Sequence, residues 1–287
     1  GVGEIRISIE TSEKFILFNV FSEPADRQRN SNFGEVRQFS FKTSGNSKFG
    51  EVHPDRLALV GILCTLPFCS EELKIDWPVS QQFHEATKVI SRVKLIFPEG
   101  SVRPLERANS GRHALSFSGG ADSTAALAVM PNSTESVFML RTKSKARTLY
   151  DSHAAIESCR KLRNLGFTVH IVESDFEYLR SPIGFPTDLA VASPAILLAD
   201  SREFESVAFG TILESAFGTS GSLYRNYADS SHFRLWSTLF QSVGLGYSLP
   251  VAGVSEVGSA ILCRDHPIGR FHQSCIRGKW GEPCNKC

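Results

Sequence analysis

The chain has 287 residues, of which 41% are hydrophobic and 21% are charged. Its 31 basic and 30 acidic side chains give a net charge of +1 at pH 7, so no global field attracts it to nucleic acid or a membrane. The longest apolar run, 57–69, is interrupted by Thr65 and Pro67 and is shorter than the roughly 20 residues of a transmembrane helix. These properties exclude a membrane-spanning protein and favour two globular units.

The first 105 residues are predicted to form a small mixed α/β domain without a recognisable chemical motif. Apolar and polar residues alternate over 4–9, as in a half-buried strand. The other expected elements are strands 15–20, 36–41 and 94–97, a polar hairpin around 27–34, and helices 56–66 and 81–93. Asp55 and Ser80 are the candidate caps of the two helices. Cys64 and Cys69 lie in an apolar run and are expected in the core rather than in a disulfide.

A linker over 104–112 leads to a second region in which strands and helices alternate, a pattern that predicts a parallel sheet. The expected strands are 114–117, 136–140, 167–172 and 206–210, and the expected helices run to Met130 and over 148–164, 190–199 and 233–243. Ligands of such sheets bind beyond the carboxyl ends of the strands. That rule predicts a crevice bounded by 118–123, Leu140, Arg141, Asp175 and 210–214.

The segment Ser118-Gly-Gly-Ala-Asp-Ser123 lies between an apolar strand and an alanine-rich helix. Consecutive glycines allow the backbone to approach an oxyanion closely, and the free N–H groups and dipole of the helix start favour a phosphate there. Hydroxyls of Ser118, Ser123 and Thr124 are additional candidate donors. The segment is neither a Walker A loop nor a dinucleotide fingerprint, so it predicts a phosphate cradle of another kind.

Basic residues follow the second predicted strand of this region: Arg141, Lys143, Lys145, Arg147, Arg160, Lys161 and Arg163. They fit a solvated loop and helix face, and they also fit contacts to ATP phosphates or an RNA backbone. The sequence leaves these alternatives open, and with them the question of nucleic-acid binding.

The second informative stretch is the cysteine-rich end, with Cys275, Cys284 and Cys287. A Cys-x2-Cys pair presents two thiolates to one tetrahedral ion, and the third cysteine adds a ligand. The fourth ligand is either beyond Cys287 or one of Cys263, His266 and His272. Seven cysteines, clustered late, fit a reducing compartment, so a cytoplasmic location is expected.

Ser-Gly-Gly-x-Asp-Ser resembles the pyrophosphate (PP) loop of the N-type ATP pyrophosphatases, which release pyrophosphate from ATP. Residues 113–287 further resemble the 7-cyano-7-deazaguanine synthase family of the queuosine pathway. Ser274 and the three cysteines match its zinc motif in spacing, Tyr227-Ala-Asp229 falls where that family has Tyr-Pro-Asp, and Gly210 matches a strand-ending glycine. The family's fourth zinc cysteine would lie three residues beyond Cys287.

Three departures from the family indicate a diverged relative. Phe185-Pro-Thr-Asp-Leu189 replaces Pro-Gly-Arg-Asn, the family's arginine near Tyr-Pro-Asp is either replaced by Ser231 or displaced, and Glu256 replaces a lysine. Such relatives, some encoded in antiphage defence operons, are thought to attach a deazaguanine to another molecule.

The resemblance implies a parallel α/β sheet with helices on both faces. The expected units are a mixed α/β domain over 1–105, a PP-loop domain over 106–250 and a C-terminal zinc segment, or zinc knuckle, over 251–287. It implies ATP, Mg²⁺ and Zn²⁺ as cofactors. Asp122 and Ser123 are the expected catalytic residues and Glu214, Tyr227 and Asp229 contact the substrate. The expected ATP-binding residues are Ser116, Phe117, Ser118, Gly119, Gly120, Asp122, Ser123, Thr124, Leu140 and Gly210.

The activity implied is adenylation of a 7-carboxy-7-deazaguanine-like carboxylate followed by attack of an amine, which yields a nitrile, an amide or a conjugate of a partner protein. Two alternatives remain open from the sequence: a tRNA-thiolating PP-loop enzyme and an inactive nucleotide-binding subunit. A homodimer is a further expectation. The amine acceptor is not identified by the sequence.

Overall fold

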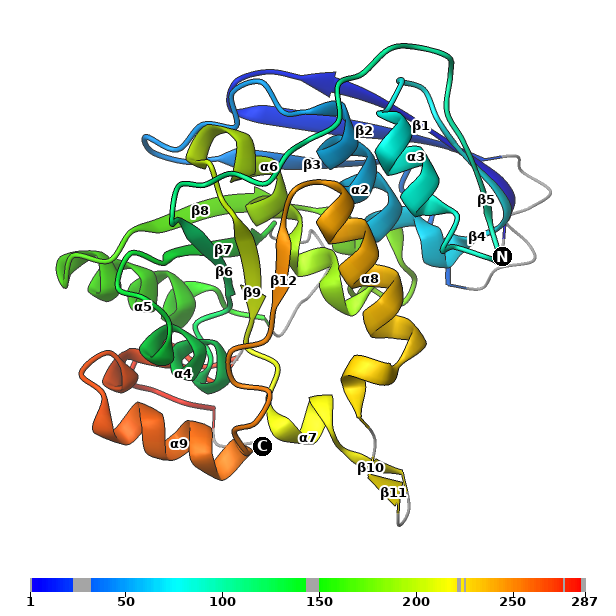
Figure 1. Cartoon of the computed structure of the whole chain (residues 1–287). Helices are drawn as coiled ribbons and strands as arrows, with labels where there is room; N and C mark the ends of the chain where they lie inside the picture. Colours follow the sequence, from blue (N-terminus) through cyan, green and yellow to red (C-terminus); the bar gives the residue numbers. More distant parts are fainter. Residues whose placement is uncertain are drawn as a thin grey trace.

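A computed structural model of the chain describes residues 2–22, 32–142, 150–220, 223–224, 226–275 and 277–284 (Figure 1). Residues 27–31 of the expected hairpin, the basic residues Lys143, Lys145 and Arg147, and Cys287 lie outside these ranges. Ten of the described strands form one sheet in the order β12-β9-β6-β7-β8-β3-β2-β1-β4-β5, and β10 and β11 form a separate two-stranded ribbon. Within the described ranges, no helix is long and apolar enough to cross a membrane.

The strands of the large sheet are β1 (Val2–Thr11), β2 (Phe15–Ser22), β3 (Gln38–Thr43), β4 (Cys69–Ile75), β5 (Lys94–Ile96), β6 (His113–Phe117), β7 (Glu135–Arg141), β8 (Val169–Ser174), β9 (Ser206–Phe209) and β12 (Gly246–Ser248). The ribbon is formed by β10 (Thr219–Ser220) and β11 (Leu223–Tyr224). The α-helices are α2 (Pro54–Thr65), α3 (Gln81–Thr87), α4 (Ala121–Val129), α5 (His153–Asn164), α6 (Ser193–Arg202), α7 (Leu213–Ala216), α8 (Ser231–Ser242) and α9 (Glu256–Asp265). Short 3-10 helices are η1 (Leu66–Phe68), η2 (Phe176–Leu179), η3 (Asp188–Ala192), η4 (Tyr227–Asp229) and η5 (Gly269–Phe271).

One half of the sheet is parallel, as the alternation of strands and helices predicts. Its order β8-β7-β6-β9-β12 places the third, second, first, fourth and fifth parallel strands side by side. The chain therefore crosses from one side of β6 to the other between β8 and β9. In doubly wound sheets, ligands bind where the strand order reverses, which here is the gap between the carboxyl ends of β6 and β9.

Helices cover both faces of this parallel half, as expected. Side chains alternate along each strand, so Ala114 and Val207 join a core with α2, α6 and α8, whereas Leu115 and Ala208 join a second core with α4, α5 and α9. Figure 1 shows α4, α5 and α9 together on one side of the sheet and α2, α6 and α8 on the other. The two cores fix the edge of the sheet on which the loop after β6 emerges.

The sheet as a whole is mixed, because its other half is built from strands of the N-terminal region, for which a mixed α/β arrangement was expected. β3 pairs with β8 antiparallel, β2 pairs antiparallel with β3 and β1, and only β4 and β5 add further parallel pairs. These strands alternate buried and exposed residues because helices cover one of their faces only. The proposed unit boundary at residue 105 stays a prediction, although both sides of it contribute strands to one sheet.

The two predicted helix caps of the N-terminal region differ in outcome. Ser80 caps α3, because its Oγ accepts the N–H of Phe83 at 3.1 Å. The prediction for Asp55 is wrong, since α2 begins two residues earlier behind His53. The buried Asp55 carboxylate instead accepts hydrogen bonds from Ser80 N and Oγ, at 2.7 and 2.6 Å. Asp55 thus joins the starts of α2 and α3.

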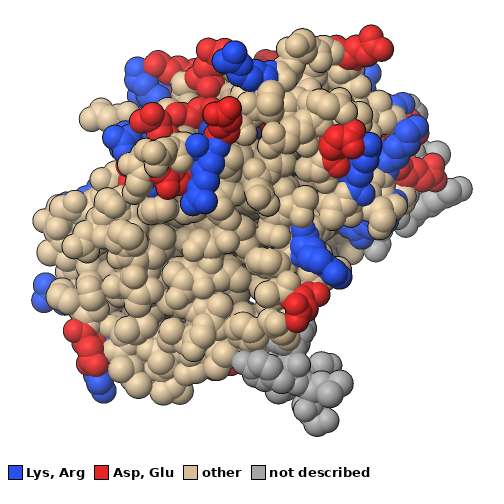
Figure 2. Space-filling view, in the orientation of Figure 1, with Lys and Arg blue, Asp and Glu red and all other residues tan. Residues whose placement is uncertain are grey.

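Charged groups of both signs mix on the face seen in Figure 2, and they gather mainly over the N-terminal strands and helices. The lower part of that face, over α4 and α9, carries few charges. This distribution agrees with the net charge of +1, and no single-sign surface is visible from this side.

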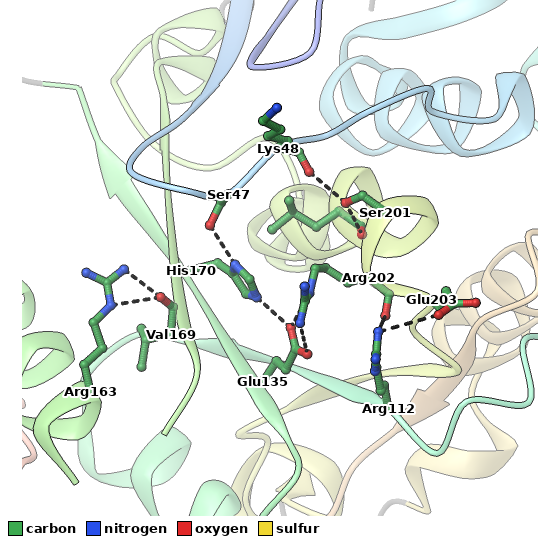
Figure 3. Close-up of polar contacts among 11 residues, drawn as sticks. Ser47, Lys48, Arg112, Glu135, Arg163, Val169, His170, Ser201, Arg202 and Glu203 are labelled. Carbon is green, nitrogen blue, oxygen red and sulfur yellow. Dashed lines mark hydrogen bonds and ion pairs between the residues drawn. The ribbon is translucent and has the colours of Figure 1, made fainter. Parts of the chain in front are cut away.

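A buried ionic network ties the N-terminal region to the parallel half at the amino edge of the sheet (Figure 3). Glu135, at the start of β7, accepts two hydrogen bonds from Arg202, at 2.7 and 2.9 Å, and one from His170, at 2.6 Å. His170 also bonds Ser47, which follows β3, at 2.8 Å. Burial raises the pKa of Glu135, but His170 and Arg202 outweigh it and bring that pKa down to about 2. An open cleft of about 750 Å³ adjoins the network, at the edge opposite the predicted crevice.

We expect Glu135→Gln to lower the free energy of unfolding at pH 7 by about 1–3 kcal/mol, because it leaves buried donors unsatisfied. The folded-state pKa of Glu135 lies below its ordinary 4.5, so its stabilising contribution is present above about pH 4.5 and is lost as the pH falls towards 2. Urea denaturation should therefore show the difference between wild type and variant shrinking below about pH 3.

Glu157→Gln is the matched control, since Glu157 pairs with the exposed Arg160 on the surface of α5 and such pairs contribute about 0–1 kcal/mol. Equal stability of the two variants at pH 7 would contradict a structural role for the Glu135 network.

Candidate functional site

The loop between β6 and α4 has the backbone geometry of an anion cradle. Gly119 has φ +82°, a conformation that glycine adopts without strain, and Gly120 is the N-cap of α4. In the described part of the chain, the N–H groups of Gly119, Asp122 and Ser123 donate to no other group. Free N–H groups at a helix start form a ready site for a phosphate.

The loop hydroxyls fold back on the loop itself. Ser123 Oγ accepts the N–H of Ser118 at 3.2 Å and lies 3.0 Å from Ser118 Oγ. Thr124 Oγ1 donates to Gly120 O at 2.8 Å. Ser123 and Thr124 are buried, so in this structure their hydroxyls shape the cradle, and direct donation to a phosphate stays a prediction.

Gly210, at the end of β9, lies against the first turn of α4. A Cβ on Gly210 would be 2.8 Å from the backbone N of Ser123 and 2.9 Å from the carbonyl carbon of Asp122. Any side chain there would displace backbone rather than a flexible group. The sequence prediction that this glycine borders the loop is thus matched by a contact that only glycine permits.

We expect Gly210→Ala to weaken the binding of pyrophosphate and of Mg-ATP by roughly tenfold or more, since forcing a methyl group into filled space costs about 1–3 kcal/mol. Isothermal titration calorimetry would measure both affinities. Gly253→Ala is the control, because its Cβ would meet nothing within 4 Å. Unchanged affinity in Gly210→Ala would show that the contact does not set the loop geometry.

A mainly apolar pocket of about 220 Å³ opens beside the first residue of the loop. The Arg141 guanidinium lies over the Tyr150 ring, 4.3 Å from its centroid, and 5.4 Å from that of Phe185. Arg141 is held by Glu177 at 2.6 Å. The remaining lining residues are Ser116, Phe117, Ser118, Phe138, Met139 and Val191. A flat aromatic base would fit between such groups.

This pocket brings together Ser116, Phe117 and Ser118 as predicted, but not Leu140. Leu140 packs, partly buried, against the core under α4 and α5, and the residues on either side of it line the pocket. Tyr150 and Phe185 were not predicted from the sequence as lining residues. Arg141, which directly follows an expected strand, was predicted both to border the crevice and to belong to the basic stretch, and it lines the pocket.

Negative charge gathers beside the loop. Burial raises the pKa of Asp122, and the charges of the nearby Glu256 and Glu214 raise it further, against a lowering by the nearby Ser259 hydroxyl. Glu214 already accepts the N–H of Glu256 at the start of α9, at 3.0 Å. In the described ranges, no three His, Cys, Asp or Glu side chains form a metal-binding group. A Mg²⁺ ion would fit beside Asp122 only with phosphate oxygens and water as its other ligands, which is its usual preference.

Tyr227 and Asp229 lie on η4, and the structure does not group them with Glu214. The Tyr227 hydroxyl is 2.7 Å from His232 Nδ1 and 2.9 Å from the Tyr247 hydroxyl. The exposed Asp229 accepts a hydrogen bond from Asn226 at 2.8 Å. Their roles in substrate binding remain predictions, and His232 and Tyr247 are new members of this cluster.

The segment before the first cysteine of the C-terminal motif holds the phosphate loop. Gln273 N donates to Gly119 O at 2.6 Å, and Ser274 Oγ accepts the N–H of Ala121 at 3.4 Å. Cys263, buried in α9, donates to Ala121 O at 3.4 Å. The loop is thus closed from outside by residues that precede Cys275 directly.

Two of the three predicted metal-binding cysteines are described, and they lie together. Cys275 Sγ accepts the N–H of Gly278 at 3.1 Å and that of Cys284 at 3.4 Å. Hydrogen bonds from Cys284 and from other backbone N–H groups lower the pKa of the Cys275 thiol to about 7. A thiolate stabilised in this way suits a zinc ion.

The ligand set is incomplete within the described residues. Cys263 is bonded to the loop helix, His266 Nδ1 accepts the N–H of Ile268, and His272 bonds Gly269 O. None of these three candidates joins Cys275 and Cys284 in a metal-binding group. The zinc knuckle therefore stays a prediction, for which the described residues supply two thiolate ligands.

We expect one zinc ion per chain in protein prepared without added metal, measured by elemental analysis. Cys275→Ser and Cys284→Ser should lower the content severalfold, because each removes a thiolate ligand. Cys69→Ala, a change at a buried cysteine outside the cluster, should leave it unchanged. Folded wild-type protein without zinc would contradict this prediction.

Together, the fold and the loop define an α/β protein with an oxyanion cradle at the switch point of a doubly wound sheet. Residues 235–287 match a family described as a family of unknown function, DUF6395. No curated protein matches the chain. The U34-tRNA thiolase NcsA from Methanococcus maripaludis, solved with its 4Fe-4S cluster, is 14% identical; the match covers 72% of this chain and 66% of that one, with a TM-score of 0.34. A similarity this weak supports no conclusion about activity.

Proposed function

We propose that the protein is an ATP pyrophosphatase of the PP-loop type, which cleaves ATP to AMP and pyrophosphate. The observation that carries this proposal is the free N–H cradle of Gly119, Asp122 and Ser123 at the switch point between β6 and β9. The pocket beside Ser116 is of a size and character suited to the adenine base. The base and the phosphates would then occupy neighbouring parts of one crevice.

The first step would be attack of a substrate carboxylate oxygen on the α-phosphorus, which forms an acyl-adenylate and releases pyrophosphate. Such a step requires positioning and charge neutralisation more than proton transfer. The loop N–H groups hold the β- and γ-phosphates as negative charge accumulates on them. Asp122 orients the phosphate end of the nucleotide, to which Mg²⁺ binds. A Mg²⁺ ion, when bound, supplies charge neutralisation to the phosphate oxygens.

For the carboxylate we propose 7-carboxy-7-deazaguanine or a close relative. The spacing of Cys275, Cys284 and Cys287 and the position of Tyr227-Ala-Asp229 support this choice. An amine then attacks the acyl carbon and AMP leaves. The departures at 185–189 and at Glu256 favour an amine other than ammonia, such as an amino group of a partner protein, in a setting such as antiphage defence. The N-terminal strands would supply surface for such a partner.

The thiolation alternative finds little support in the described cysteines other than Cys275 and Cys284, which are assigned above to the predicted metal site. Cys64, Cys69, Cys159 and Cys263 are all buried, and burial raises the pKa of Cys159 to about 12. A thiol with that pKa is almost entirely protonated at pH 7 and is a poor sulfur carrier.

We expect the protein to release pyrophosphate rather than orthophosphate from Mg-ATP when 7-carboxy-7-deazaguanine is present. Gly120→Val should reduce this release by at least about 100-fold. A branched side chain would overlap the space that the phosphate occupies, and relieving that overlap costs several kcal/mol. The measurement is quantification of AMP, ADP, pyrophosphate and orthophosphate after incubation, with Gly253→Ala as the matched control.

Orthophosphate and ADP as primary products would reject the pyrophosphatase assignment. Absence of AMP with this carboxylate, together with AMP formation on added tRNA, would move the thiolation reaction to first place. Binding of ATP without turnover under either condition would identify an inactive nucleotide-binding subunit.

A further inference from the structure

A chain of hydrogen bonds connects four side chains from four elements on the substrate side of the crevice. Tyr247 of β12 lies 2.9 Å from the Tyr227 hydroxyl of η4, and Tyr227 lies 2.7 Å from Nδ1 of His232. His232, in the first turn of α8, places Nε2 3.2 Å from Asp188 Oδ1 of η3. No chemical role was predicted for Asp188, His232 or Tyr247 from the sequence.

The protons of this chain can be assigned from the chemistry of its ends. An ionised carboxylate only accepts hydrogen bonds, so His232 Nε2 carries the proton and donates to Asp188. His232 Nδ1 is then an acceptor, and the Tyr227 hydroxyl donates to it. Tyr247 in turn donates to Tyr227. The hydrogen bond from His232 lowers the pKa of Asp188, which keeps that carboxylate ionised near neutral pH.

The chain is connected to the proposed adenine pocket through Phe209 and Ser116. The Tyr247 ring lies 5.2 Å from the ring of Phe209 on β9, and Phe209 is paired in register with Ser116 on β6. Ser116 lines the pocket and donates to Val191 O in η3, the 3-10 helix that begins with Asp188. Tyr227, His232 and Asp188 therefore lie on the face of the sheet on which a substrate beside the nucleotide would lie.

We propose that Tyr227 relays a proton from the amine that attacks the acyl-adenylate to His232, which is the general base, with Asp188 as a positioning residue; this inference rests on the proposed function. The amine nitrogen forms a bond to the acyl carbon, and the bond between that carbon and the phosphate oxygen breaks, so that AMP leaves. The nitrogen loses its proton to the Tyr227 oxygen while the Tyr227 proton moves to His232 Nδ1. The imidazolium that forms is stabilised by Asp188.

The test separates the two half-reactions with 7-carboxy-7-deazaguanine as the carboxylate. Exchange of labelled pyrophosphate into ATP reports adenylate formation. Hydroxylamine, a small amine that captures acyl-adenylates, reports amine attack as hydroxamate. We expect Tyr227→Phe and His232→Ala to keep exchange within about twofold and to slow hydroxamate formation about 100-fold or more, the usual contribution of a general base. Imidazole added to His232→Ala should restore part of the rate.

Asp188→Asn provides a readout that a structural role would not move. The variant keeps an oxygen partner for His232 Nε2 but removes the negative charge that stabilises the imidazolium, so hydroxamate formation should slow about tenfold or more while pyrophosphate exchange stays within about twofold. Ser237→Ala, a change on α8 outside the chain of bonds, should leave both the exchange and the rate of hydroxamate formation unchanged.

Wild-type protein that does not exchange pyrophosphate overturns the proposed function, and this inference with it. Wild-type exchange with normal hydroxamate formation in Tyr227→Phe, or with no hydroxamate in wild type, overturns the inference alone.

Discussion

The geometry of the candidate site depends on the contact between the end of β9 and the first turn of α4. Gly210 allows the two backbones to approach so closely that a single Cβ would lie 2.8 Å from Ser123 N. This contact sets the width of the gap at the switch point and the direction of the α4 N–H groups. The hydroxyls of Ser123 and Thr124 then brace the loop from within. The position of the cradle and the direction of its N–H groups therefore follow from this one close approach between two backbone segments.

The loop, the helices α2, α4, α5, α6 and α8 and the strands β6, β7, β8 and β9 could be predicted because local patterns encode them. Glycines at fixed offsets and the period-two alternation of apolar residues are properties of short segments. The order of the strands could not be predicted in the same way. The pairing of β3 with β8 joins Phe41 to Ser174 across more than a hundred residues, and nothing near either strand specifies the partner or its direction.

Elements with weak local signals were missed for related reasons. β4 carries Glu71 and Glu72 among its residues, and β12 has only three residues, so both depend on neighbours for their conformation. The lining of the apolar pocket and the Tyr227–His232–Asp188 chain likewise have no local sequence signal. Each side chain there is unremarkable in its own segment, and only the tertiary fold brings η3, η4 and α8 together. Sequence therefore identifies the phosphate end of the crevice better than the substrate end.

The hydrogen bonds of Gln273 and Ser274 to the phosphate loop have a thermodynamic consequence. They place Cys275 one residue from Ser274, which holds Ala121, and two residues from Gln273, which holds Gly119. A ligand on the Cys275 thiolate and an anion in the loop would therefore act on one stretch of backbone. When two ligands bias the same element, each alters the affinity of the other by an equal factor. Nucleotide bound in the crevice should then change the affinity of the cysteine pair for the predicted zinc ion, and loss of zinc should weaken phosphate binding by the same factor. Through the C-terminal segment, the availability of a metal ion would then help to control the use of ATP.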